Sequence, residues 1–247
     1  MKALILAAGY GTRLYPYIKN YPKPLLEINQ KPIIEYLLDK LIRLDALSEV
    51  IIVTNERFFK HFKKWRDGLG SKVKIKIIND LSKCPEEKLG AVKDMYLVFK
   101  EEGFDDDYLI LGGDNFFRDP LDRFISFARK KAPGVSIGVV DIHNKSEARH
   151  YGVVSLNQRN QILEFKEKPA KPDSSLVATC IYYFPRDKVK LIKGCIDDSK
   201  VCFDNLGVYI DWLTKKDKVY GFIFKHLWVD IGRIETYEKL KEIMKGE

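Results

Sequence analysis

The amino-acid sequence predicts an α/β fold, with helices flanking a mixed, mainly parallel sheet. Its 247 residues are enough to bury one large hydrophobic core. Before Gly134, apolar runs typical of buried strands alternate with amphipathic helical patterns, which predicts parallel pairing through crossover helices. After Gly134, strands follow one another across short polar turns, which predicts an antiparallel extension. The sequence contains no linker, repeat or low-complexity segment, so we expect one domain over residues 1–247.

The first half consists of strand–helix units. A helix opened by Pro32 is predicted by apolar residues that recur with the helical period, at Ile33, Ile34, Leu37, Leu38, Leu41 and Ile42. Alternation of apolar residues with lysines predicts a half-exposed strand over Lys72–Ile78. The other predicted strands are Lys2–Ala7, Glu49–Thr54 and Tyr108–Gly112, and the other predicted helices are Glu56–Asp67, Leu89–Glu101 and Pro120–Lys131.

The second half has a different pattern of predicted elements, because most of them are strands. Apolar, β-branched and aromatic residues cluster in four segments that short polar turns separate, such as the turn Asn157–Gln161. We predict strands at Val135–Ile142, Gly152–Leu156, Ile162–Lys166 and Leu176–Phe184. Helices at Arg186–Lys193 and Asn205–Lys215, a strand at Val219–Phe224 and a closing helix at Ile234–Lys245 complete the prediction.

Composition excludes several classes of protein. The apolar fraction of 45% is that of a globular protein and argues against disorder. No apolar run approaches the roughly 18–20 residues needed to span a bilayer, and we recognise no secretory signal, so we expect a cytoplasmic protein with no membrane partner. The net charge of +8 is dispersed, without an interleaved stripe of aromatic and basic residues, so we expect no nucleic-acid partner. The four cysteines lack zinc-ligand spacing, and we expect them to be reduced.

A glycine turn follows the first predicted strand, in the segment Leu6–Leu14. Glycines at positions 9 and 11 allow backbone N–H groups to approach a phosphate. A dinucleotide fingerprint would need a third glycine where Leu14 stands, and the Gly-Lys-Ser/Thr of a Walker A loop is missing, so both common phosphate loops are excluded. A Gly-x-Gly turn is also common in plain connections. The adjoining Arg13, a multidentate phosphate donor, favours phosphate binding.

A second basic residue, Lys23, lies between Pro22 and Pro24. The two prolines restrict the backbone on either side, which suits a lysine that must hold one position. Taken alone, this residue would be interpreted as a surface lysine in a turn. Its significance depends on the glycine turn that precedes it.

Together these segments resemble the signature of the sugar-1-phosphate nucleotidyltransferases. The resemblance rests on Ala7-Ala8-Gly9-x-Gly11-Thr12-Arg13-Leu14, Pro22-Lys23-Pro24-Leu25, Leu111-Gly112-Gly113-Asp114-Asn115, Tyr151-Gly152-Val153-Val154 with Phe165-Lys166-Glu167-Lys168-Pro169 and Ala178-Thr179-x-Ile181-Tyr182, and Trp228-Val229-Asp230-Ile231-Gly232. Within that family, the Gly-Asp-Asn, Tyr-Gly-Val-Val and Glu-Lys-Pro segments look most like glucose-1-phosphate thymidylyltransferases. The implied fold is a single Rossmann-like sheet, with a nucleotide-binding half at residues 1–133 and a sugar-phosphate-binding half at 134–247.

The resemblance also implies a reaction and a role for each matching residue. A sugar phosphate oxygen would attack the α-phosphorus of a nucleoside triphosphate and expel pyrophosphate. The implied catalytic residues are Arg13, Lys23 and Asp114, and the implied Mg²⁺ ligands are Asp114 and Asp230. The implied nucleotide-binding residues are Leu6, Ala7, Ala8, Gly9, Gly11, Thr12, Arg13, Asn79, Asp80, Leu89, Gly90 and Gly113; those for the sugar phosphate are Tyr151, Gly152, Glu167, Lys168 and Thr179.

The resemblance leaves several substrate pairs open. Glucose 1-phosphate with dTTP or UTP is the first expectation, and a cytidylyltransferase for a sugar or polyol phosphate is the second. A non-catalytic nucleotide- or sugar-phosphate-binding subunit is the rival from another class, and a homo-oligomer stays open. The segment Ser82–Lys88 does not match the thymidylyltransferase pattern, and Cys180 stands where the family usually has glycine. A D-x-D sequence at Asp105–Asp107 precedes its strand, so we expect it at the opposite end of the sheet from the ligand.

Overall fold

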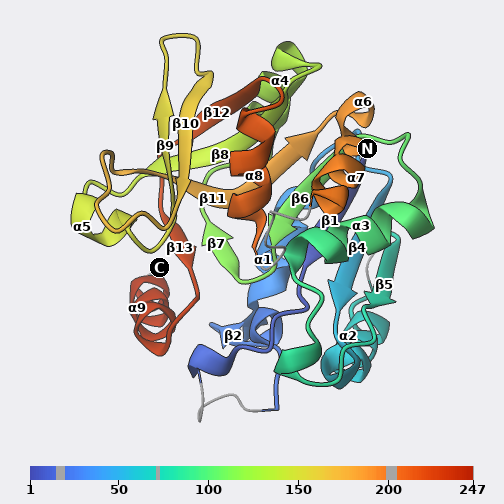
Figure 1. The fold of residues 1–247 in the computed structure, drawn as a ribbon. Helices are drawn as coiled ribbons and strands as arrows, with labels where there is room; N and C mark the ends of the chain where they lie inside the picture. The colour runs from blue at the N-terminus through green and yellow to red at the C-terminus, as the bar shows by residue number, and fades with distance from the viewer. Residues whose placement is uncertain (15–19, 71–72, 199–204, 247) are drawn as a thin grey trace.

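The computed structural model describes residues 1–14, 20–70, 73–198 and 205–246; Lys72 and Cys202 fall outside these ranges. Within them, one nine-stranded sheet forms the centre of the molecule (Figure 1). Its strands are β1 (Lys2–Leu6), β4 (Glu49–Thr54), β5 (Ile75–Asn79), β6 (Tyr108–Gly112), β8 (Val135–Asp141), β9 (Gly152–Leu156), β10 (Ile162–Glu167), β11 (Leu176–Phe184) and β12 (Val219–Phe224). The main path is β10-β9-β11-β6-β1-β4-β5, and β8 pairs with both β11 and β12.

The sheet is mixed, as the sequence predicts. β1 lies between β4 and β6 and is parallel to both, so that Leu4 is level with Ile51 on one side and Ile110 on the other. β11 then pairs antiparallel with β6 and leads into the antiparallel strands β8, β9 and β10. Strands from before and after Gly134 therefore share one sheet, with the parallel part at one side and the antiparallel extension at the other.

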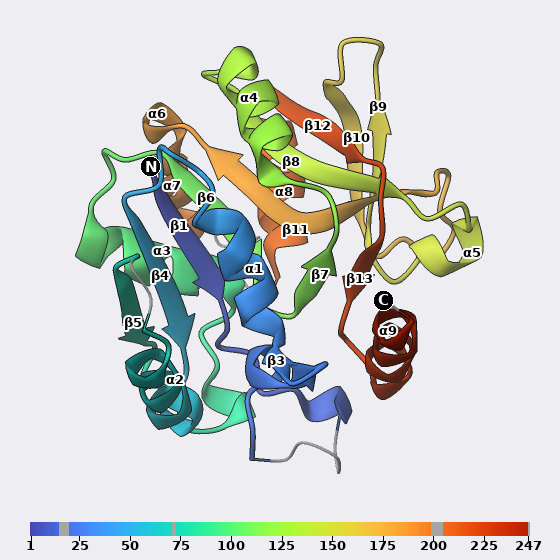
Figure 2. The same ribbon diagram turned by 180° about the vertical axis from the view of Figure 1, so that it is seen from behind.

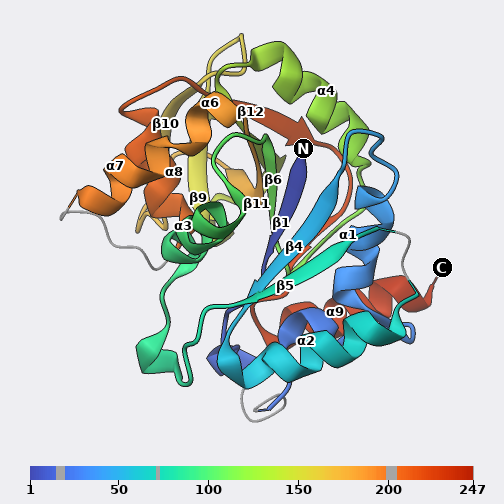
Figure 3. The same cartoon turned by 90° about the vertical axis from the view of Figure 1, so that its right-hand side faces the viewer.

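Helices cover both faces of the sheet, as Figure 3 shows from its side. They are α1 (Ile33–Leu41), α2 (Glu56–Gly68), α3 (Ala91–Glu102), α4 (Leu121–Lys131), α5 (Lys145–Ala148), α6 (Arg186–Val189), α7 (Leu191–Asp197), α8 (Leu206–Thr214) and α9 (Ile234–Lys245). Leu4 packs in the core beneath α3, α7 and α8, whereas Ala3 and Ile5 pack in the core beneath α1, α2 and α4. Burial on both faces explains the continuous apolar run of β1. In the described ranges, no helix is both long and apolar enough to cross a membrane.

The structure corrects several boundaries. The helix expected from Leu89 begins at Ala91, because Gly90 has a φ of 86° and is not helical. The helix expected over Arg186–Lys193 is divided at Lys190 into α6 and α7. Two short ladders were not expected: β2 (Glu27–Ile28) with β3 (Lys31–Pro32), and β7 (Asn115–Phe117) with β13 (Trp228–Asp230). Strands of two or three residues are too short to produce a periodic signal.

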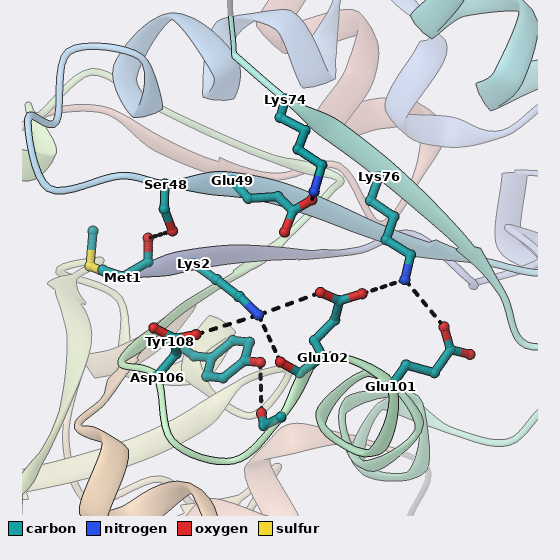
Figure 4. A network of polar contacts seen from close by, with 11 residues as sticks. Met1, Lys2, Ser48, Glu49, Lys74, Lys76, Glu101, Glu102, Asp106 and Tyr108 are labelled. Carbon is teal, nitrogen blue, oxygen red and sulfur yellow. Dashed lines mark hydrogen bonds and ion pairs between the residues drawn. The ribbon is translucent and has the colours of Figure 1, made fainter.

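A network of charged residues lies at the amino ends of the parallel strands (Figure 4). Lys2 Nζ lies 3.4 Å from a carboxylate oxygen of Glu102 and 3.4 Å from one of Asp106, and Lys76 of β5 also pairs with Glu102. Asp107 accepts hydrogen bonds from the Tyr183 hydroxyl and the Arg186 N–H, each at 2.9 Å. The D-x-D sequence thus belongs to the structural network at this edge, as the sequence predicts.

Candidate active site

A cleft of about 480 Å³ opens at the other edge of the sheet, at the carboxyl ends of β1 and β6. The arrowheads of β1, β4 and β5 in Figure 2 point toward this edge. Open α/β sheets bind ligands outside the carboxyl ends of their strands. The lining comes from the loop after β1, the start of α3, the loop after β6, the starts of β9 and α8, and strands β10, β11 and β13. The cleft therefore draws on both halves of the chain.

The loop after β1 forms one wall of the cleft. Gly11 has a φ of 64°, which favours glycine, and its carbonyl accepts a hydrogen bond of 2.9 Å from Leu14 N–H. This bond closes a short 3₁₀ turn that presents Arg13 at the surface. A methyl group added at Gly232 would lie 3.9 Å from Nη1 of Arg13 and 3.4 Å from Oδ2 of Asp230. The guanidinium of Arg13 therefore lies close to the segment that carries Asp230.

The short ladder of β7 and β13 brings the two aspartates together. Asn115 pairs with Asp230 in this ladder, and Ile231 N–H donates to the carbonyl of Asp114 at 3.0 Å. Lys23 Nζ lies 3.2 Å from Oδ2 of Asp114 and 3.4 Å from the carbonyl of Ile231, so it joins both strands of the ladder. Segments far apart in the sequence thus hold two carboxylates and one ammonium group in the same part of the cleft.

The electrostatics of this cluster favour cation binding. Burial, together with the nearby charge of Asp114, raises the pKa of Asp230 to about 6, while Lys23, Arg13 and Lys168 act in the opposite direction. Two carboxylates close enough to disfavour each other's charge could hold a divalent cation, with phosphates and water as its remaining ligands. In the described part of the chain, no cluster of three or more His, Cys, Asp or Glu side chains could hold a metal ion.

Another part of the lining contains Glu167 and Lys168, at the end of β10. Lys168 N–H donates to the carbonyl of Tyr151 at 3.0 Å, and its backbone has a φ of 46°, which turns the chain out of the strand. Lys168 Nζ lies 3.5 Å from Oε1 of Glu167. Burial raises the pKa of Glu167, and the ammonium of Lys168 lowers it. This part of the lining offers a half-exposed cation beside a largely buried acceptor.

The third region of the cleft contains two buried aspartates. Oδ1 of Asp80 accepts hydrogen bonds of 2.8 Å from both the N–H and the hydroxyl of Ser82. Tyr10 in turn donates to the Ser82 hydroxyl at 3.2 Å. Asp94, in the first turn of α3, is only 5% exposed. Its burial and the charge of Asp80 raise its pKa to about 8, so at pH 7 its side chain is mostly neutral.

Most of the residues predicted from the sequence line this single cleft. They are Leu6, Ala7, Ala8, Gly9, Gly11, Thr12, Arg13, Lys23, Asp80, Gly90, Asp114, Tyr151, Gly152, Glu167, Lys168, Thr179 and Asp230. Asn79, Leu89 and Gly113 are not part of its lining. Asn79 donates to Glu56 and accepts from the N–H of Leu81, and Gly113 N–H donates to the carbonyl of Leu6, joining the ends of β6 and β1.

Other lining residues were not identified from the sequence. Asn115, which is 3% exposed, accepts a hydrogen bond of 2.8 Å from the indole N–H of Trp228. The Trp228 ring packs edge-on against Tyr151, with centroids 5.3 Å apart. The sequence could have identified Asp94, because it is an acidic residue among the buried apolar positions of its helix. No sequence pattern identifies Gly207, at the start of α8.

Comparison with known proteins identifies relatives along the whole chain. The profile of the nucleotidyl transferase family matches residues 2–246. The bifunctional protein GlmU of Methanocaldococcus jannaschii is 30% identical over 234 residues, which cover 94% of this chain and 52% of GlmU. The UTP–glucose-1-phosphate uridylyltransferase AglF of Haloferax volcanii is 32% identical over 255 residues, covering 100% of this chain and 98% of AglF. The chain spans about half the length of the GlmU proteins that it matches.

A solved structure from Bacillus anthracis shares the fold. It is described as a glucose-1-phosphate thymidylyltransferase in complex with a sucrose, and it superposes with a TM-score of 0.82 at 22% identity. The superposition covers 99% of this chain and 95% of that one. With the profile match over nearly every residue and the full-length likeness to AglF, the chain belongs to the nucleotidyl transferase family.

Proposed function

We propose that this chain transfers a nucleotidyl group from a nucleoside triphosphate to a sugar 1-phosphate in the cytoplasm, with Mg²⁺ as its cofactor. The observation that supports this most strongly is the convergence of Asp114, Asp230 and Lys23 in one cleft, whose lining also contains Lys168. A cleft with two carboxylates for a cation and separate cations for phosphates suits the joining of two polyanions. A module that only binds a nucleotide has no need of both carboxylates.

In the proposed reaction, an oxygen of the sugar phosphate attacks the α-phosphorus of the triphosphate. A new P–O bond forms while the bond from the α-phosphorus to its β-bridging oxygen breaks, and pyrophosphate leaves with that electron pair. The sugar phosphate, with a second pKa near ~6, is largely dianionic at neutral pH, so the step needs no general base. Catalysis then consists of positioning the reactants and stabilising the charge of the leaving group.

Different residues of the cleft position the two reactants and stabilise the charge of the leaving group. Arg13 and Lys23 neutralise the triphosphate and the departing pyrophosphate. Lys168 binds the phosphate of the acceptor, and Glu167 accepts hydrogen bonds from its sugar hydroxyls. Asp114 and Asp230 would hold Mg²⁺, which when bound neutralises phosphate charge; the raised pKa of Asp230 beside Asp114 fits this role.

Several substrate pairs are consistent with the relatives. Names among them include a UTP–glucose-1-phosphate uridylyltransferase and a glucose-1-phosphate adenylyltransferase, so glucose 1-phosphate is the first acceptor to test. UTP and dTTP are the first donors, and the Asp80 region is where we expect the base to lie. Transfer of a cytidylyl group to a sugar or polyol phosphate is the second candidate, because Ser82–Lys88 departs from the thymidylyltransferase pattern.

The test is pyrophosphate release with each of five nucleoside triphosphates against a panel of sugar and polyol phosphates, with and without EDTA. We expect one donor–acceptor pair to dominate, with activity that EDTA abolishes and added Mg²⁺ restores. If no pair reacts while a nucleotide still raises the melting temperature, the chain is a binding subunit and the proposal is wrong.

A further inference from the structure

The carboxylate of Glu167 lies between two glycines, Gly152 and Gly207, which together we call the glycine slot. Gly152 is the partner of Glu167 across the β9–β10 ladder. A methyl group added there would lie 2.3 Å from Cζ of Phe165 and 3.2 Å from Oε2 of Glu167. A methyl group added at Gly207 would lie 1.8 Å from Oε2 and 2.5 Å from Cδ. Side-chain carbons do not approach other atoms to under 3.0 Å. No residue with a Cβ therefore fits at position 207 while Glu167 keeps its place.

The other side of the slot is the first turn of α8. Asn205 caps this helix by accepting a hydrogen bond of 3.0 Å from Val208 N–H, and α8 packs against β10, the strand that carries Glu167. The partial positive charge of a helix amino end favours a carboxylate beside it. A glycine inside a helix costs roughly 0.5–1 kcal/mol relative to alanine, so helix propensity does not explain Gly207. The three atoms nearest to its missing methyl group all belong to Glu167.

We infer that Gly207 is a positioning residue for the acceptor: its missing side chain gives the Glu167 carboxylate the place from which it binds sugar hydroxyls. This inference rests on the proposed function, which assigns those hydroxyls to Glu167. Gly207 itself acts only through Glu167, so its effect disappears when that carboxylate is removed. This dependence separates positioning from a general loss of stability.

The main test is a double-mutant cycle with Gly207→Ala and Glu167→Ala. The added methyl group forces Oε2 to move by about 1 Å or more, and a displacement of that size can lower a rate by about 10²-fold. We expect Gly207→Ala to lower kcat/KM for the sugar phosphate by about that factor, mainly through KM, with the KM for the nucleotide unchanged. In the Glu167→Ala background, the same substitution should cost nothing further. Equal losses in both backgrounds, or an unchanged acceptor KM in the single variant, would overturn the inference.

Gly194→Ala is the matched control. Gly194 lies in α7, and a methyl group added there would lie 3.5 Å from the Trp212 ring of α8, which is an ordinary contact. We expect both KM values of this variant to match the wild type. If Gly207→Ala alone fails to fold, the double variant should still fold, because it lacks the clash. A double variant that also fails would contradict our explanation of Gly207.

A second measurement does not depend on activity. Burial raises the pKa of Glu167, and ¹³C NMR of glutamate-labelled protein can follow its titration. Gly207→Ala pushes the carboxylate out of the slot, so we expect its pKa to fall toward the ordinary value. An unchanged titration would mean that the carboxylate stays in place. If the wild type releases no pyrophosphate with any acceptor, the proposed function fails, and this titration alone decides whether Gly207 positions Glu167.

Discussion

The buried aspartate of α3 gives the sharpest prediction about stability. Asp94 is 5% exposed, and its Oδ1 has no hydrogen-bond partner among the described residues. Its pKa is about 8 in the folded chain, compared with an ordinary value of 3.8. The folded state therefore binds this proton more tightly than the unfolded state does. The stability that the neutral side chain provides is complete below about pH 4 and is lost as the pH rises toward 8.

The size of the effect on the free energy of unfolding follows from the difference between the two pKa values of Asp94. Each pH unit above the ordinary value costs ~1.4 kcal/mol, so at pH 7 the penalty on the free energy of unfolding reaches roughly 4 kcal/mol. Asp94→Asn keeps the shape of the side chain and removes its titration. We expect the variant to be more stable than the wild type at pH 7 by roughly this amount, and the advantage to shrink by ~1.4 kcal/mol per unit toward pH 5.

Urea unfolding of both proteins at pH 5, 6, 7 and 8 measures this difference. Asp45→Asn, at an exposed position, is the matched control, and its stability should stay within about 0.5 kcal/mol of the wild type at every pH. An Asp94→Asn difference that is the same at all four pH values would refute the reasoning, because it would mean that Asp94 does not carry a proton in the folded state.

Three further substitutions test the cleft. Asp114→Asn should lower kcat by about 10²–10³-fold in the pyrophosphate-release assay, the cost of removing one charge-stabilising group elsewhere; near-normal turnover would remove Asp114 from the proposed metal site. Lys168→Ala should raise the KM for the sugar phosphate much more than the KM for the nucleotide. Equal changes in the two KM values would mean that Lys168 does not bind the sugar phosphate selectively. Trp228→Phe leaves the buried Asn115 oxygen without its donor and should cost ~1–3 kcal/mol of unfolding free energy in urea; an unchanged midpoint would contradict this.

Local patterns in the sequence predict the central sheet well. The run before Gly9 and the run Tyr108–Gly112 are apolar throughout because β1 and β6 are buried on both faces. Because β1 and β6 are parallel, their carboxyl ends lie at the same edge of the sheet, where the cleft is found. The residues that such patterns predict best are those attached directly to a strand end, such as Asp114.

Long-range pairing is not predictable in this way. The Trp228–Asn115 hydrogen bond joins positions 113 residues apart. Strands of three residues are too short to show a periodic pattern, so the sequence does not predict that they pair. Asn79 and Asp80 show a different limit, because successive residues at a strand end point to opposite sides, and composition does not say which one faces the ligand. Gly207 becomes significant only when the Glu167 carboxylate is seen against it.

The central claim is that Asp114 and Asp230 together hold a divalent cation with the nucleotide. Mn²⁺, a paramagnetic substitute for Mg²⁺, can be titrated by EPR into the wild type, Asp114→Asn and Asp230→Asn, each with the preferred triphosphate bound. Asp106→Asn, at the opposite edge of the sheet, serves as control. We predict that Mn²⁺ binding weakens strongly in both cleft variants and is unchanged in the control. Equal affinity in all four proteins would contradict the claim.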